Sequence, residues 1–288
     1  MNASETFVYK NFKGLELKSS YYQATTNVKN HVLLYFHGGG LVYGTRDDLP
    51  ANHLQTLLEN GYHVLTFDYP LAPETGLPEI YECVKEAVQW FQENSQEKFS
   101  VSKEAFSLFG RSAGAYLVYL LARDSEVPNP EKVIAFYGYD SLLYEEFTKP
   151  STYYKKFPSM PKAILDRMIG DTPVAHGPIQ TRFTLYLHAR QSGEWMNFLG
   201  VDKKEAEKFS LTDEELSSLP PVFIAHSDAD EDVPYKIGKK LSEKIPKSYF
   251  HEVKGMEHDF DREAEAPQTI QVYQKLIDWL SDSVFHSA

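Results

Sequence analysis

The sequence has 288 residues, of which 42% are hydrophobic, enough for one sizeable globular core. Its formal net charge is −12, and it has no dense block of Lys and Arg, which argues against binding to the phosphates of nucleic acid. Its apolar runs are far shorter than the ~20 residues that a membrane-spanning helix needs, so no membrane span is expected.

The single cysteine, Cys83, leaves no internal disulfide to form. The first residues, MNASETFVYKNF, contain neither the basic segment nor the apolar segment of a secretory signal peptide. From these two features we predict a cytoplasmic protein.

Short runs of β-branched and aromatic residues alternate with longer segments of helical period. This alternation is typical of a mostly parallel sheet with helices on both faces. A leading antiparallel hairpin is expected at 6–23. The strands predicted after it are 31–36, 62–69, 105–110, 132–138, 221–226 and 248–255. The predicted helices are 48–60, 78–94, 113–124, 234–245 and 265–282.

About eighty residues without a convincing strand separate the fourth and fifth of these strands. Helical segments are predicted there at 161–170, 178–191, 201–209 and 212–219. The last of them begins with a capping box formed by Thr212 and Glu215. We therefore expect an inserted helical cap at 141–218, whose many aromatic residues form a small core of its own. The α/β core would then comprise 1–140 and 219–288.

The clearest chemical motif is GRSAG at 110–114, which lies directly between a predicted strand and a predicted helix. A sharp strand-to-helix turn exposes a serine hydroxyl above the edge of a sheet. Glycines two residues before and after the serine let the strained backbone pass close to its neighbours. We interpret Ser112 as a nucleophile on such an elbow; a chance match is the alternative, and the strand–helix context argues against it.

A serine nucleophile needs a base that takes its proton and an acid that orients the base. On this architecture the acid precedes the histidine in the chain, and both follow the serine. Asp230 and His258 each lie just past the carboxyl end of a predicted strand, where sites on open α/β sheets are built. Asp228 and Asp232 lie in the same loop, but the spacing to the next helix favours Asp230.

The motif HGGG, residues 37–40, follows the first strand after the hairpin. Backbone N–H groups in such a loop can stabilise the oxyanion of acyl transfer, by about 3 kcal/mol for each donor. Gly38 and Gly39 can offer such groups because no Cβ fills the space that the substrate needs. Ala113, which follows the serine, is the predicted third donor, and His37 is expected to anchor the loop. A phosphate-binding turn or a plain loop is the alternative.

Four motifs now follow one another along the chain: HGGG at 37–40, DYPLAPE at 68–74, GRSAG at 110–114, and the pair DEDVPY…GMEHDF at 230–235 and 255–260. In this order they resemble the α/β-hydrolases, and more narrowly their hormone-sensitive-lipase-like group of esterases and lipases. The resemblance covers residues 31–262 and implies an α/β-hydrolase fold with a sheet of about eight strands. It also implies that Tyr69 and Glu74 brace the oxyanion loop.

The chain departs from that family at several points. Pro70 and Arg111 stand where family members usually carry an arginine and an acidic residue. The family's helical cap at the N-terminus has no counterpart before the first predicted strands, and residues 141–218, inserted after the sixth strand, are expected to replace it. Since cap residues shape the substrate pocket, the substrates of the family transfer poorly to this chain.

These features predict a carboxylesterase that cleaves small esters through an acyl-enzyme. Ser112 would attack the ester, His258 would carry the proton, and Asp230 would orient His258. No metal or organic cofactor is implied, and the expected partner is a small-molecule ester. Whether the chain forms a homodimer is left open.

Aromatic residues of the cap, such as Tyr153, Tyr186 or Trp195, are expected to roof the pocket and limit the acyl chain to about two to six carbons. One alternative is a peptidase of the prolyl-oligopeptidase-like branch, but such enzymes usually carry a large propeller domain. Another is a non-catalytic small-molecule binding protein on the same fold, like the plant hormone receptors that have lost the catalytic histidine. The presence of His258 argues against it.

Overall fold

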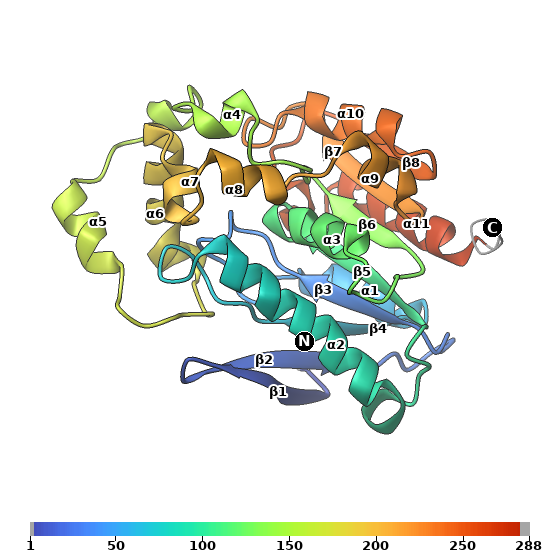
Figure 1. Cartoon of the computed structure of the whole chain (residues 1–288). Coiled ribbons are helices and arrows are strands. Elements are labelled where there is room, and N and C mark those ends of the chain that lie inside the picture. Colours follow the sequence, from blue (N-terminus) through green and yellow to red (C-terminus); the bar gives the residue numbers. More distant parts are fainter. Residues whose placement is uncertain (1–2, 283–288) are drawn as a thin grey trace.

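A computed structural model describes residues 3–282. In this part of the chain, one sheet of eight strands has the order β1-β2-β4-β3-β5-β6-β7-β8 (Figure 1). The strands are β1 (Glu5–Phe12), β2 (Leu15–Tyr22), β3 (Val32–Phe36), β4 (His63–Phe67), β5 (Phe106–Arg111), β6 (Val133–Phe136), β7 (Val222–Ser227) and β8 (Ser248–Val253). The pairs β1–β2 and β2–β4 are antiparallel and the other neighbours are parallel, so the predicted mostly parallel sheet with a leading hairpin is confirmed.

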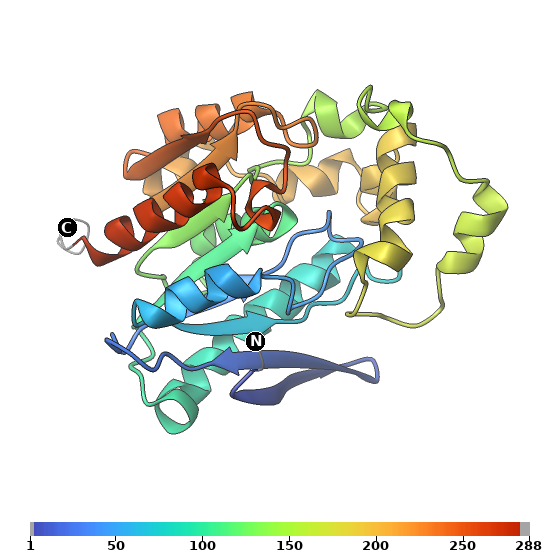
Figure 2. The same ribbon diagram turned by 180° about the vertical axis from the view of Figure 1, so that it is seen from behind.

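Helices cover both faces of the sheet (Figures 1 and 2). One face carries α2 (Leu77–Phe99), α3 (Ala113–Arg123) and α10 (Tyr235–Lys244), and the other carries α1 (Ala51–Glu59) and α11 (Pro267–Ser281). Strands β3 to β7 are buried at every position, which explains their near-continuous apolar sequences. The carboxyl ends of the parallel strands therefore meet at one edge, where the predicted site residues follow them.

Between β6 and β7 the structure has helices and loops but no strand of the sheet. We call residues 141–218 the cap segment. Its helices are α4 (Glu145–Thr148), η1 (Tyr154–Lys156), α5 (Lys162–Met168), α6 (Ile179–Ser192), α7 (Trp195–Phe198), α8 (Lys203–Lys208) and α9 (Asp213–Ser218). Helix α5 lies farthest from the sheet in both views (Figures 1 and 2). The capping box of Thr212 and Glu215 is present at the start of α9.

The expected separate core of the cap segment is not what the structure shows. The buried rings Phe147, Tyr154 and Trp195 belong to the same apolar cluster as the strand residues on the α2–α3 face. The cap segment therefore buries these apolar side chains in the cluster that it shares with the sheet and not in a core of its own. The division into core and cap domains remains a prediction.

Candidate active site

Ser112 lies on the sharp turn between β5 and α3, with φ 53° and ψ −118°. This conformation is rare for a residue other than glycine and persists where its surroundings enforce it. The flanking glycines permit the turn: a Cβ on Gly110 would lie 2.2 Å from the oxygen of Gly114, and one on Gly114 would lie 2.1 Å from the oxygen of Phe36. The turn thus has the geometry of the predicted nucleophile elbow.

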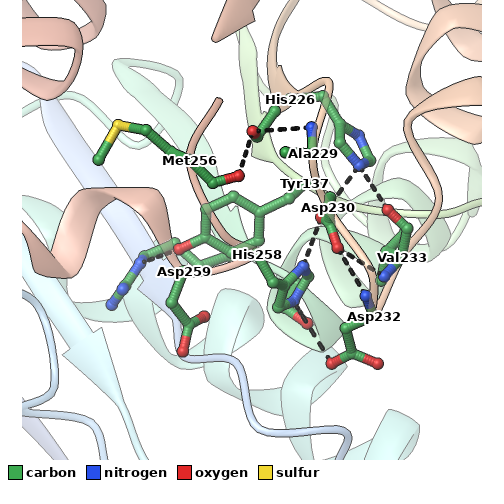
Figure 3. Close-up of polar contacts among 12 residues, drawn as sticks. Tyr137, His226, Ala229, Asp230, Asp232, Val233, Met256, His258 and Asp259 are labelled. Atoms are coloured by element: carbon green, nitrogen blue, oxygen red, sulfur yellow. Dashed lines mark hydrogen bonds and ion pairs between the residues drawn. The ribbon is translucent and has the colours of Figure 1, made fainter. Parts of the chain in front are cut away.

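The structure brings the three residues of the predicted triad together. His258 Nε2 lies 2.9 Å from Ser112 Oγ. On the other side of the ring, His258 Nδ1 lies 2.6 Å from Asp230 Oδ2 (Figure 3). Asp230 Oδ1 accepts hydrogen bonds from the backbone N–H groups of Asp232 (2.9 Å) and Val233 (2.8 Å). The carboxylate is therefore fixed on one side by the loop and presents its other oxygen to the imidazole.

The two neighbouring aspartates have other partners. Asp228 accepts a hydrogen bond from the Gly255 N–H (2.7 Å) and pairs with Lys254 at the surface (3.1 Å). Asp232 is buried, accepts a hydrogen bond from the hydroxyl of Tyr186 (2.8 Å), and pairs with Arg190 in the cap segment. Among these three aspartates, Asp230 alone contacts Nδ1 of the imidazole.

A buried histidine that sequence reasoning missed supports the acid. His226, near the end of β7, points Nε2 at the carbonyl oxygen of Val233 (2.8 Å) and lies 3.2 Å from Asp230 Oδ2 (Figure 3). The signal available in the sequence was its position at the carboxyl end of a predicted strand, four residues before the acid.

The charges in this cluster shift both pKa values. Burial alone would raise the pKa of Asp230, but the charge of His258 and the hydrogen bonds from His226 and His258 hold it well below its usual range. Burial likewise would lower the pKa of His258, but the charge and hydrogen bond of Asp230, with Asp232 and Asp259 nearby, raise it to about 9. The ionised carboxylate thus stabilises the protonated form of the imidazole.

The glycine loop after β3 lies against the serine turn. A Cβ on Gly38 would lie 2.9 Å from the oxygen of Arg111 and 3.2 Å from the Cβ of Ser112, so the two backbones approach closely only because Gly38 has no side chain. Within residues 3–282, no backbone carbonyl accepts a hydrogen bond from the N–H groups of Gly38, Gly39 or Ala113. Gly38 thus lies against Ser112, and Ala113 directly follows it in the chain, while the role of all three N–H groups as oxyanion donors stays a prediction.

The residues of the DYPLAPE motif contact this loop directly or through the cap segment. The hydroxyl of Tyr69 donates to the carbonyl oxygen of His37 (2.7 Å), and the two rings stack at 4.1 Å. Glu74, almost fully buried, pairs with Arg182 of α6, whose Nε donates to the carbonyl oxygen of Val42 (2.8 Å). Tyr69 therefore contacts the glycine loop directly, as the resemblance implied. Glu74 reaches it through Arg182, a residue that the sequence analysis did not single out.

Two rings that were expected to roof the pocket lie against the glycine loop instead. Trp195 is buried and donates from Nε1 to the carbonyl oxygen of Gly40 (2.9 Å). The ring of Tyr186 occupies the space beside Gly40, only 2.2 Å from where a Cβ on that glycine would lie. Their position follows from burial, since both rings point from α6 and α7 of the cap segment into the apolar cluster that it shares with the sheet.

A pocket of about 480 Å³ opens beside His258. Its aromatic lining is Tyr43, Tyr153, Tyr154, Phe157, Phe183 and Phe260, and its charged lining is Glu231, Asp232, Glu257, Asp259, Glu263 and Arg262. Of the three rings predicted to limit the substrate, Tyr153 lines this pocket.

Within residues 3–282, no helix is long and apolar enough to cross a membrane. The same residues contain no group of three or more His, Cys, Asp or Glu side chains that could hold a metal ion.

Sheet order, elbow and glycine loop together define the class of protein. The family described as alpha/beta hydrolase fold matches residues 33–262, and the chain belongs to that family. A protein of unknown function from Staphylococcus aureus is 33% identical, with a TM-score of 0.85 over 96% of this chain and 98% of its own. An alpha/beta hydrolase superfamily protein from Enterococcus faecalis is 30% identical, with a TM-score of 0.83 over 97% and 99% of the two chains. The predicted fold class and the resemblance to the hormone-sensitive-lipase-like esterase group are confirmed.

Among curated proteins, an arylesterase from Saccharolobus solfataricus is 33% identical over 118 residues, which cover 39% of this chain and 37% of that protein. The chain spans less than two thirds of such relatives: 51% of a carboxylic ester hydrolase from Mycobacterium tuberculosis and 9% of a non-reducing polyketide synthase from Penicillium rubens. Two of these three relatives are thus named as esterases or ester hydrolases.

Proposed function

We propose that this protein is a serine carboxylesterase that hydrolyses small esters through an acyl-enzyme. The observation that carries the proposal is the continuous hydrogen-bonded chain from Asp230 through His258 to Ser112. His258 takes the proton of Ser112 as Oγ bonds to the ester carbonyl carbon, and then gives it to the departing alkoxide. A water molecule, deprotonated by the same imidazole, then attacks the acyl carbon. The bond from that carbon to Ser112 Oγ breaks, the imidazole returns the proton to Oγ, and the acid leaves.

The free N–H groups of Gly38, Gly39 and Ala113 would receive the negative charge that develops on the carbonyl oxygen. Loss of one such donor lowers the rate by roughly 100- to 1000-fold in comparable sites. Because Tyr69 and Trp195 hold the glycine loop by its carbonyl oxygens, its N–H groups are oriented before the substrate arrives. Preorganisation of this kind is the main source of electrostatic stabilisation in such enzymes.

The triad is tested by removing its members. Ser112→Ala and His258→Ala should each abolish nearly all hydrolysis of a nitrophenyl ester, and the double variant should lose little more, because the residues act as a unit. Asp230→Asn should lower kcat far more than Asp228→Asn, which removes a surface carboxylate. Ser217→Ala, on the exposed face of α9, is the control for the serine change. Substantial turnover in Ser112→Ala or His258→Ala would refute the assignment.

We further propose that the ester has a short acyl group. The pocket beside His258 is walled by Tyr153, Tyr154 and Phe183 of the cap segment, which leaves a limited apolar volume. With nitrophenyl esters of increasing acyl length, each CH₂ that is buried should add roughly 0.8 kcal/mol of binding free energy. The value of kcat/KM should therefore rise up to about six carbons and then fall. A value that still climbs at ten or twelve carbons would show an open groove. Faster cleavage of an aminoacyl anilide than of any ester would favour the peptidase alternative.

A further inference from the structure

Arg111, which replaces the family's acidic residue beside the nucleophile, is the centre of a buried polar network. Its side chain leaves the end of β5 and is only 3% exposed. Nη2 donates to Asp261 Oδ1 (2.9 Å), Nε donates to the hydroxyl of Tyr137 (2.8 Å), and Nη1 donates to the hydroxyl of Tyr35 (3.2 Å). Asp261 is fully buried, so each charge depends on the other.

The ion pair connects the nucleophile turn to the histidine loop by a path outside the triad. Arg111 directly precedes Ser112, and Asp261 lies three residues after His258. The same guanidinium lies 3.5 Å from Asp48, at the far end of the loop that begins with the HGGG motif. Three segments that carry predicted site residues therefore meet at one side chain.

Tyr137, just after β6, links this network to the imidazole. Its hydroxyl donates to Asp261 Oδ1 (2.6 Å), and its ring lies 4.7 Å from the ring of His258 at 62° (Figure 3). Its φ is 40°, a conformation that bulky side chains rarely adopt and that persists only where the surroundings enforce it. Its backbone N–H donates to the carbonyl oxygen of Ala225 (2.7 Å), and its hydroxyl is held by Arg111 and Asp261, so the residue is fixed at both ends.

The tilt of the His258 ring depends on its hydrogen bonds at Nδ1 and Nε2, on its covalent bond to Cβ, and on what packs against the ring. The ring of Tyr137 supplies such packing, at 4.7 Å and an interplanar angle of 62°. A shift of the Tyr137 ring would let the imidazole turn about its side-chain bonds. We propose that Tyr137, held by Arg111 and Asp261, is a positioning residue that sets the tilt of His258 toward Ser112. Its effect on turnover rests on the esterase function proposed above.

The matched pair of variants is Tyr137→Phe and Tyr273→Phe. Both lose a hydroxyl that donates to Asp261, but the ring of Tyr273 stacks on His53 (3.9 Å) and not on His258. Tyr137→Phe should lower kcat by about tenfold or more with little change in KM, because small misplacements of a catalytic group cost up to about 100-fold. Tyr273→Phe should keep kcat within twofold of the wild type.

A spectroscopic readout separates positioning from stability. The imidazole N–H proton that His258 shares with Asp230 should shift in the proton NMR spectrum of Tyr137→Phe and stay in place in Tyr273→Phe, with both proteins folded in thermal unfolding. Wild-type kcat and an unshifted resonance in folded Tyr137→Phe would overturn the proposal, as would equal losses in the two variants. If Tyr137→Phe does not fold, Asp261→Asn is judged by the same two readouts.

The spectrum also keeps this proposal separate from the esterase function. If the wild type hydrolyses no ester, the proposed function fails, while the resonance of His258 in the two variants still decides whether Tyr137 positions the ring. If the wild type is active, kcat and the resonance should change together.

Discussion

At the scale of single residues, the protonation of His258 should control activity. The imidazole can take the serine proton only when it is neutral, yet Asp230, Asp232 and Asp259 favour its charged form. A raised pKa means that the base is still protonated in part of the molecules at neutral pH. Activity in the free enzyme should therefore increase as the pH rises above the ordinary histidine range.

We expect kcat/KM for a neutral ester to rise with pH through an apparent pKa above 6.5 and toward about 9. Asp259→Asn removes one negative charge that favours the imidazolium, so it should move this limb to lower pH. Asp228→Asn is the control, because that surface carboxylate pairs with Lys254 and is not among the charges that shift His258. An apparent pKa below 6.5 in the wild type would contradict this expectation, as would an apparent pKa that does not change in Asp259→Asn.

At the scale of elements, the packing of α3 against β3 depends on a glycine. Gly114→Ala would place a Cβ 2.1 Å from the Phe36 oxygen and 2.5 Å from the His37 oxygen, both of them backbone atoms. We expect the free energy of unfolding in urea to fall by about 3 kcal/mol or more. Gly170→Ala is the control, since its Cβ would meet nothing closer than 3.9 Å and the change should stay within about 1 kcal/mol.

The elements also show how far local sequence patterns reach. The parallel strands were predictable because burial on both faces makes their sequences continuously apolar, and the longer helices because their periodicity spans several turns. Helices α4 and α7 have only four residues each, too few for a period to appear. Helix α2 runs to Phe99, five residues past its predicted end, until Ser100 adopts a left-handed conformation.

In the candidate site, too, some residues could be predicted from the sequence and others could not. Ser112, Asp230 and His258 could be predicted because each follows a strand at a characteristic spacing. Trp195 could not, since its bond to Gly40 joins residues 155 positions apart. Nor could the grouping of Arg111, Tyr137 and Asp261, whose members lie on three segments that only the folded sheet brings together.

At the scale of the whole molecule, negative charge should select among substrates. The net charge is −12, and the pocket beside His258 is lined by five carboxylates and one arginine. Glu231, Glu257 and Glu263 are exposed at this lining, so their charges face the approaching ester. The resulting negative potential raises the local concentration of cations and lowers that of anions.

We expect an anionic ester to show a kcat/KM about tenfold or more below that of a neutral ester of equal size at low salt. Raising the ionic strength from about 0.01 M to about 1 M shortens the Debye length from about 30 Å to about 3 Å, so the gap should narrow. Glu257→Gln should reduce the difference in kcat/KM between the two esters in part at low salt. The neutral ester is the internal control, because its kcat/KM should change little. A gap that does not respond to salt would show that shape, and not charge, excludes the anion.

The contacts of α6 and α7 with the glycine loop limit how this protein can acquire new specificity. Arg182, Tyr186 and Trp195 belong to the segment that walls the pocket, yet they also hold the loop that bears the proposed oxyanion donors. Exchange of the whole cap segment with that of a relative would change the pocket wall. In the same step it would remove the contacts that hold the glycine loop. Substitutions around η1 are less constrained, because Tyr153 and Phe157 line the pocket there. Such substitutions can change the substrate preference and leave the glycine loop and the triad unchanged.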